Sequence, residues 1–569
     1  MKHSRFTSLA TVFALFAGLS QAGEPPQTDQ NSEQSGATVQ NTAEIEILKR
    51  QLAEQQKQIE ELRAIVLGQK KPMDAVVTKD AAATNQVAST VPYIPSTLLA
   101  KASPMPLTIP AQVPAKPSTA ATNPCEATGE AKSPAFIHIG DTCLVPVGFM
   151  DLTAFWRDKN AGSSLGSNFS AVPFNNVTAG KLSEFRFTPQ NSRIGFRFDG
   201  NWKGSHVIGY NEFDFLGTSG GNNLGVTNGA FVPRLRLFWV DVRKDNFEVL
   251  AGQSWSMLTP NRKSISALPG DLFYSQVIDV NYMAGLTWTR QPGIRFLYHG
   301  MSDKFTAGVS FENPDQYIGG SAGTSATAVT LPAAAALSGI GGTQADNASN
   351  VLNTPNVHPD IIAKLAFDPS AKFHIEVAGI ERTFKIYNSA TKTYSTKAGG
   401  GVLLAANGEI FKNFRLLTTN FWSDGGGRYM FGTAPDFVVR ADGTVSPIHA
   451  GGTVNGFEAT IKNTLIYGYY GAYYIQKNTA LDANGTSKIG YGYAGSPNSN
   501  NRSIQEISFG FNQTLWKSPR YGALNAMGQY EYLTRYLWAV AAGQPKATHD
   551  NTIYFNLRFT LPGGMPAFK

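Results

Sequence analysis

The sequence predicts an all-β transmembrane barrel of about 16 antiparallel strands, and three observations lead there. In Ile553–Leu561, apolar residues alternate with Tyr, Asn, Arg and Thr, so a tilted strand of this segment presents one face to lipid and one to water. No apolar run of about 18 residues follows the N-terminal region, which excludes membrane-spanning helices there. Short turns alternate with long Gly- and Ser-rich connections, as in outer-membrane barrels. A soluble sandwich strand shows the same alternation, so the assignment depends on the whole chain.

Charged residues are few, and basic residues outnumber acidic ones. Charged residues make up 16% of the chain, which is low for a soluble protein, and the formal net charge of +7 suits an anionic partner. The basic residues stand singly in strand-like segments, and no nucleic-acid motif occurs. This pattern favours the wall of a pore, with solvated surface charge as the alternative.

The first 143 residues read as export and tethering segments. Residues 1–22 resemble a secretory signal peptide, and 23–43 a disordered spacer. Residues 44–68 carry heptads with Ile45, Leu52, Ile59 and Val66 at one position, which predicts a short coiled coil; a single amphipathic helix on the barrel or membrane is the alternative. Residues 69–143 form a Pro/Ala/Thr-rich linker.

The two cysteines lie at the end of this linker. In an exported protein, Cys125 and Cys143 are expected to form a disulfide, which contributes about 3 kcal/mol in the chain-entropy model. Two thiols without nearby histidines do not favour a metal site, and no cofactor is expected.

Residues 144–561 are predicted to form the barrel, and residues 562–569 a C-terminal tail. Pro292 and Gly293 leave open whether 284–300 is one strand or two, so the count carries a margin of two. An even number brings both ends of the barrel to the periplasmic side, and about 16 strands leave an aqueous lumen. The expected strands are 146–157, 191–202, 205–216, 231–244, 246–256, 284–300, 304–313, 359–368, 372–386, 396–411, 414–423, 452–463, 465–476, 503–515, 521–536 and 550–561.

Several barrel motifs resemble those of the DcaP-like outer-membrane porins. They are Gln190-Asn-Ser-Arg-Ile-Gly-Phe196, Glu212-Phe-Asp-Phe215, Arg234-Leu-Arg236, Ala251-Gly-Gln-Ser-Trp-Ser256, Phe311-Glu-Asn-Pro314, Pro359-Asp-Ile-Ile-Ala-Lys-Leu365 and Gly425-Gly-Gly-Arg-Tyr429. The resemblance implies a homotrimer of 16-stranded barrels with a periplasmic coiled coil, passing small anions that include dicarboxylates. The cysteine pair, the long linker and the tail depart from the family's pattern.

Candidate solute-binding residues are basic side chains of the lumen, because rings of one charge sign select ions in pores. Alternation turns four arginines inward, two lie in family-like segments, and two basic residues belong to the connection 257–280, which either folds into the lumen as a constriction or lies outside. The alternative is that Glu212 and Asp214, which share the inward phase, neutralise some of them. The candidates are Arg193, Arg197, Arg234, Arg236, Arg262, Lys263, Arg382 and Arg428.

The sequence thus favours a non-enzymatic outer-membrane porin for small anionic solutes, surrounded by lipid, with its N-terminal region in the periplasm. A second hypothesis is a structural anchor, in which a plugged barrel is tied to the cell wall through the coiled coil. A third is an outer-membrane hydrolase, because 217–221 and 319–323 match G-x-S-x-G, although both lie in glycine-rich loops rather than at a strand-to-helix elbow. The solute itself is not predicted.

Overall fold

The computed structural model describes residue 125 and residues 133–217, 231–273, 275–318, 329–333, 357–388, 392–496 and 500–564. The predicted signal peptide, spacer and coiled coil, most of the linker, and residues 565–569 lie outside this part of the chain. Within it, no helix has the length and apolar character needed to cross a membrane.

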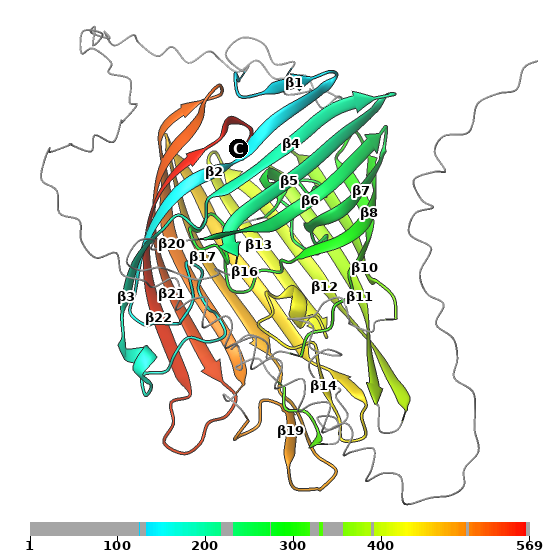
Figure 1. The fold of residues 1–569 in the computed structure, drawn as a ribbon, viewed down its shortest axis with the longest axis vertical. Helices are drawn as coiled ribbons and strands as arrows, with labels where there is room; N and C mark the ends of the chain where they lie inside the picture. The colour runs from blue at the N-terminus through cyan, green and yellow to red at the C-terminus, as the bar shows by residue number, and fades with distance from the viewer. Residues whose placement is uncertain are drawn as a thin grey trace, which may run out of the picture. The chain divides into compact units, whose positions relative to one another are not determined.

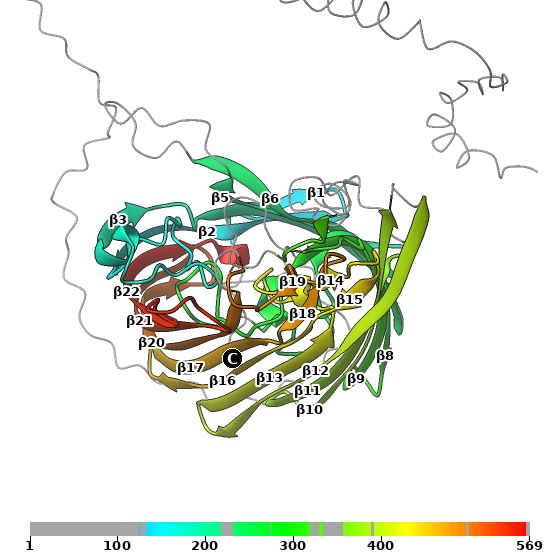
Figure 2. The same cartoon turned by 90° about the horizontal axis from the view of Figure 1, so that it is seen from below.

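The described residues form a closed antiparallel barrel of 16 strands, so the predicted fold class is confirmed (Figures 1 and 2). The ring closes where β2 pairs with β22, from Phe149 opposite Thr560 to Arg157 opposite Thr552. Its strands are β2 (Thr142–Arg157), β4 (Arg193–Trp202), β5 (Ser205–Gly217), β6 (Val232–Lys244), β7 (Phe247–Trp255), β8 (Arg290–Gly300), β9 (Phe305–Glu312), β10 (Asp360–Ser370), β11 (Phe373–Asn388), β12 (Thr393–Phe411), β13 (Phe414–Asp424), β16 (His449–Ile461), β17 (Thr464–Ile475), β20 (Asn501–Ser518), β21 (Gly522–Leu537) and β22 (Ala547–Thr560).

Shorter elements decorate this ring. The second half of β2 pairs with β3 rather than β4, so two short pieces share one place in the wall. The additional elements are β1 (Ile137–Ile139), β3 (Glu184–Thr188), the hairpin β14 (Phe437–Val439) and β15 (Val445–Pro447), the hairpin β18 (Asn478–Leu481) and β19 (Lys488–Tyr491), and the 3₁₀ turns η4 (Thr178–Lys181), η5 (Pro269–Asp271), η8 (Gly427–Tyr429) and η9 (Pro562–Gly564).

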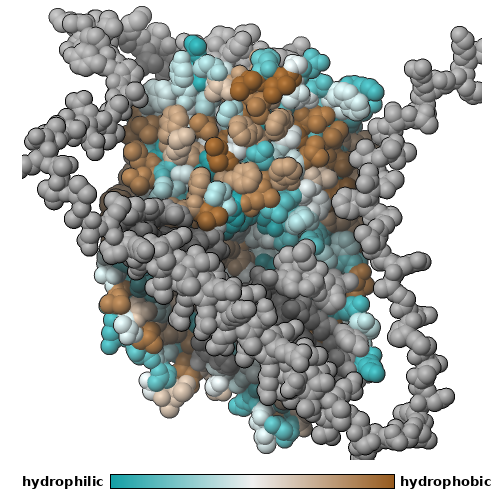
Figure 3. Space-filling model, in the orientation of Figure 1, coloured by the Kyte–Doolittle hydropathy of each residue, from teal (hydrophilic) through white to brown (hydrophobic). Residues whose placement is uncertain are grey.

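The alternation of β22 decides which face meets lipid. Phe555 and Leu557 point outward and are 62% and 48% exposed, whereas Tyr554 and Asn556 point inward and are buried. Apolar side chains likewise gather over the outer wall in Figure 3. The apolar outer surface can contact lipid, and every strand of the closed ring pairs with a strand on each side, so the backbone hydrogen bonds are formed within the wall. Both features are what a bilayer requires of a membrane-spanning barrel.

Short and long connections segregate to opposite ends, as predicted. At one end, turns such as Lys203–Gly204 and Asp245–Asn246 join strands through residues with positive φ, 49° at Lys203 and 53° at Asp245, which suits tight hairpins. The turn between β4 and β5 lies at Lys203 and Gly204, between the expected strands 191–202 and 205–216. The long connections, including β14, β15, β18 and β19, lie at the other end.

Among the strand boundaries, the start of β8 differs most from the predicted position. The expected strand 284–300 begins only at Arg290, because residues 256–289 continue as one connection. Pro292 and Gly293 lie inside β8, opposite Gln253 and Gly252 of β7, so this segment is a single strand and the count remains 16.

Candidate functional site

The connection 256–289 enters the barrel and crosses the lumen, rather than lying outside. Its backbone binds one wall residue after another: Met257 N–H donates to Glu312 of β9 (2.7 Å), Gln276 N–H to Tyr469 of β17 (3.1 Å), and Ala284 N–H to Glu506 of β20 (2.7 Å). Buried apolar residues of this lumen loop pack against inward side chains of the wall, and they include Leu258, Leu272, Phe273, Met283 and Leu286. The loop therefore narrows the lumen and fixes what lines it.

Three of the predicted arginines meet on the wall facing this loop. Arg236 lies 2.7 Å from both Glu212 and Asp214, Arg234 lies 2.8 Å from Asp214, and Arg193 lies 3.7 Å from Glu212. The neutralising carboxylates expected on β5 are thus in place, and they orient the three guanidinium groups as well as reducing their net charge.

Two further arginines adjoin this group. Arg558 of β22 pairs with Asp151 at 2.9 Å, and its guanidinium and that of Arg193 both lie over the Phe149 ring. Arg290, the first residue of β8, interacts electrostatically with Arg234 and Arg236. We call Arg193, Arg234, Arg236, Arg290 and Arg558 the arginine cluster.

Arg290 differs from the other members of the cluster. Among the described residues it forms no ion pair, and its Nη1 is buried without a hydrogen-bond partner. Its guanidinium lies 5.7 Å from the centre of the Trp255 ring. Burying this N–H group without an acceptor, close to two other guanidinium groups, costs free energy that a bound anion would offset.

The arginine cluster has a net positive charge. Five guanidinium groups face three carboxylates, those of Asp151, Glu212 and Asp214, which leaves a formal excess of two positive charges. This excess is concentrated where β22, β4, β6 and β8 bring the side chains together. The cluster therefore offers an attractive site for a small anion in the lumen.

Tyr282 joins the lumen loop to the cluster. Its hydroxyl accepts hydrogen bonds from Arg193 Nη2 and Arg236 Nη2, both at 3.4 Å. Its backbone has φ 62°, a conformation uncommon for a bulky residue and one that costs about 1–3 kcal/mol. Burial opposes ionisation of the phenol, but Arg193 and Arg236 outweigh it and hold the pKa of Tyr282 below its usual value.

The remaining predicted residues lie elsewhere. Arg197 pairs with Asp199, which also contacts His206, towards the short-turn end. Arg262 clamps the lumen loop to β16 through Glu458 (2.5 and 2.9 Å), and the neighbouring Lys263 is exposed.

Arg382 and Arg428 belong to a separate network with more acid than base. Arg382 contacts Asp360 at 3.0 Å and Asp436 at 2.8 Å, and Arg428 contacts Asp315 at 2.6 Å. These contacts hold η8 and the connection after β13 inside the barrel. Neither arginine adds uncompensated positive charge.

Sequence reasoning missed Arg290, Arg558 and Tyr282. Arg558 stands on the polar face of the alternating strand 553–561 and was accessible to the same argument as Arg193. Arg290 and Tyr282 carry no such signal, because their positions depend on the path of the lumen loop.

Cys125 and Cys143 form a disulfide with their Cα atoms 5.5 Å apart. It holds the segment before β1 against the start of β2. The described residues contain no cluster of three or more metal-ligating side chains. The G-x-S-x-G segments fall almost wholly outside the described residues, which include only Gly217 and stop at residue 318 before the second segment.

Comparison with solved structures places the fold among the porins. The outer membrane channel DcaP of Acinetobacter baumannii is similar to this chain, with 16% identity, a TM-score of 0.53, and coverage of 74% of this chain and 97% of the channel. An anion-selective porin from Comamonas acidovorans covers 74% of this chain and 100% of its own length, at 14% identity and a TM-score of 0.40. No protein-family model and no curated protein matches the chain. The resemblance to DcaP-like porins is thus confirmed at the level of the fold.

Proposed function

We propose that this protein is a porin of the bacterial outer membrane that lets small anions diffuse through an arginine-lined lumen. The arginine cluster, with its excess of two positive charges, is the observation that carries the anion preference. The fold supports a channel, since its solved neighbour with a TM-score of 0.53 is described as an outer membrane channel.

The mechanism is electrostatic and needs no reaction. A carboxylate that enters the narrowed lumen loses part of its hydration, and the cluster compensates that loss with charged donors. Arg290 offers an unpaired guanidinium, while the carboxylates of Glu212 and Asp214 keep the neighbouring arginines from binding an anion too tightly. Binding that is favourable but weak permits release on the far side.

The solute class and the assembly are inferred from the charge count of the cluster, the heptads and the family resemblance. Two carboxylates on one solute match two excess charges, so small dicarboxylates are the proposed solutes. The heptads of 44–68 and the family resemblance support a homotrimer whose N-terminal regions meet in the periplasm and reach towards the cell wall.

A plugged barrel that anchors the envelope is the second candidate. It is favoured by the amount of apolar loop inside the lumen, where Phe273, Met283 and Leu286 are almost wholly buried. In an anchor the arginine cluster would serve only to hold Tyr282 and the loop in place. An outer-membrane hydrolase has weaker support. The Thr306 hydroxyl lies 3.4 Å from His299 Nδ1, and His299 Nε2 lies 2.8 Å from Glu248, but Thr306 and His299 are both buried in the barrel wall.

Planar-bilayer recording separates these candidates. The purified, folded protein is reconstituted at low salt, and its reversal potential is measured under a KCl gradient before and after addition of succinate. We expect anion-selective openings that succinate partly blocks. Silent barrels would favour the anchor, and cation-selective openings would exclude the proposed role of the cluster.

A further inference from the structure

The outer wall carries a hollow that the proposed transport does not use. A groove of about 860 Å³ runs over β12, β13, β16, β17, β20 and β21, and its lining includes outward-facing apolar side chains. Val402, Leu404 and Trp422 are each more than half exposed there, whereas their neighbours Leu403 and Phe421 point inward and are buried. The groove therefore opens to the membrane and not to the lumen.

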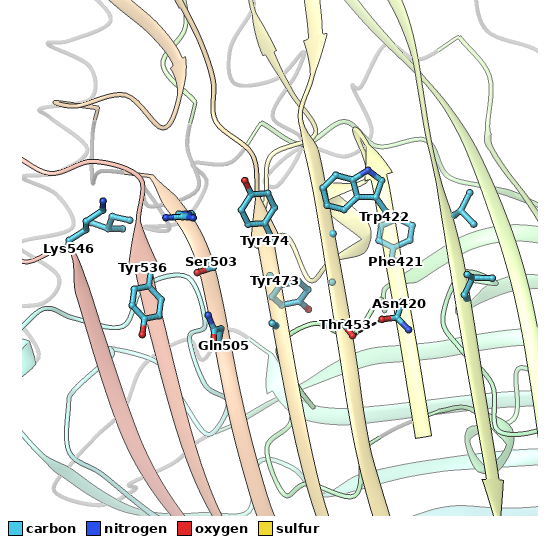
Figure 4. A pocket seen from close by; sticks show the side chains of 17 residues that line it. Asn420, Phe421, Trp422, Thr453, Tyr473, Tyr474, Ser503, Gln505, Tyr536 and Lys546 are labelled. Carbon is cyan, nitrogen blue, oxygen red and sulfur yellow. Dashed lines mark hydrogen bonds between the residues drawn. The ribbon is translucent and has the colours of Figure 1, made fainter. Parts of the chain in front are cut away.

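Residues with little or no side chain create the hollow. Gly451 and Ala472 lie in the middle of the groove lining, between the larger residues of the neighbouring strands. Trp422 and Tyr474 stack with ring centres 6.4 Å apart across this gap and form one side of the trough. Figure 4 shows Trp422, Tyr474, Ser503 and Lys546 placed across the wall at a similar height.

Cations line one end of the groove. Arg502 and Lys546 belong to its lining. Lys477 and Arg502 both contact the Trp538 ring, at 5.8 and 5.1 Å from its centre. All three are exposed, and in the described part of the chain none of them forms an ion pair. They sit at strand ends next to the long connections, which in outer-membrane barrels face the cell exterior.

An apolar trough below uncompensated cations matches an amphiphile with an anionic head. Guanidinium and ammonium groups bind phosphate well, and exposed Trp and Tyr rings mark the level of the headgroups. Ser503 and Gln505 supply polar groups just below the cations. A second copy docked through a two-fold contact fits less well, because that contact brings the same unpaired cations together; a heterologous contact with a second copy is an outcome of the test below.

We propose that this groove binds a phosphorylated lipid of the outer leaflet, with its phosphate held by Arg502 and Lys546 and its acyl chains along Val402, Leu404 and Trp422. The inference rests on the outer-membrane location in the proposed function and is independent of anion transport. Binding there places a lipid against β16 and β17, whose Glu458 and Tyr469 side chains hold the lumen loop.

Native mass spectrometry of the delipidated full-length protein in detergent tests this, with diphosphoryl lipid A as the probe and its dephosphorylated form as the comparison. The variant Arg502→Ala/Lys546→Ala removes two charges, each worth about 1 kcal/mol at a membrane surface, so its affinity should fall about 30-fold. Ala472→Trp fills the trough and should weaken both lipids. The control Lys412→Ala/Lys517→Ala removes two exposed charges at the opposite ends of β12 and β20 and should bind as the wild type does.

Three outcomes would overturn the proposal. They are equal binding of the dephosphorylated lipid, equal loss in the Lys412/Lys517 control, and full displacement by inorganic phosphate, which would show a free anion site. A change in oligomeric state of the Ala472→Trp variant without loss of lipid would instead assign the groove to a second copy. Conductance recorded on the same samples distinguishes failure of the lipid proposal from failure of the transport proposal. Loss of lipid in the Arg502→Ala/Lys546→Ala variant with unchanged anion selectivity agrees with both proposals. Barrels that bind lipid but conduct no ions would refute transport alone.

Discussion

Neutralising Arg290 should reduce anion selectivity more than any other single substitution in the lumen, because it is the unpaired member of the arginine cluster. Arg290→Gln removes one of two excess charges while keeping a polar side chain that donates and accepts hydrogen bonds. A solute carboxylate about 5 Å from a guanidinium gains about 1 kcal/mol in bulk water and about 3 kcal/mol near a protein surface. We therefore expect the ratio of anion to cation permeability to fall about 5-fold or more.

The assay is the reversal potential of reconstituted channels under a KCl gradient near 0.1 M, where the screening length is about 10 Å; at 1 M it falls to about 3 Å and hides the effect. Arg290→Lys keeps the charge and should stay near the wild type. Arg197→Ala is the matched control, because Arg197 is paired with Asp199 and lies outside the cluster. Equal selectivity in the wild type and Arg290→Gln, or an equal loss in Arg197→Ala, would refute the reasoning.

Three further predictions concern the loop and the disulfide. Because its pKa is held below the usual value, Tyr282 should ionise as the pH rises towards 10, so anion selectivity should fall at alkaline pH in the wild type and remain flat in Tyr282→Phe; identical pH profiles would contradict this. Arg262→Ala removes the ion-pair partner of the buried Glu458 carboxylate, so it should destabilise the folded barrel by about 3–5 kcal/mol and raise the channel conductance. Lys263→Ala should change neither property. Heat-dependent gel mobility measures the stability, and single-channel current measures the conductance. Cys125→Ser and Cys143→Ser should each lower stability by about 3 kcal/mol, to the level of reduced wild type, and a variant as stable as the oxidised protein would speak against a stabilising bridge.

The barrel could be predicted because alternation is a local property of sequence. Tyr554 and Phe555 differ in polarity in the printed sequence, and their opposite burial follows directly from the pleat. All 16 expected segments correspond to strands of the closed barrel, including 284–300 once its first residues are assigned to the lumen loop.

The site could be predicted only in part. Arg193, Arg234 and Arg236 follow from alternation, but pairing with Glu212 and Asp214 depends on register between strands, which the sequence leaves open. Arg382 and Arg428 carry the same residue type and yet meet acids brought in by a folded connection. Arg290 and Tyr282 become functional candidates only because a connection of 34 residues, 256–289, turns inward.

Single-channel recording of the purified full-length protein tests the central claim most directly. The account predicts ion-conducting barrels that prefer chloride over potassium, in steps of three if the trimer forms, with current reduced by added succinate. A folded barrel that conducts no ions, or one that prefers potassium, would contradict the claim that the arginine cluster serves an open anion pathway.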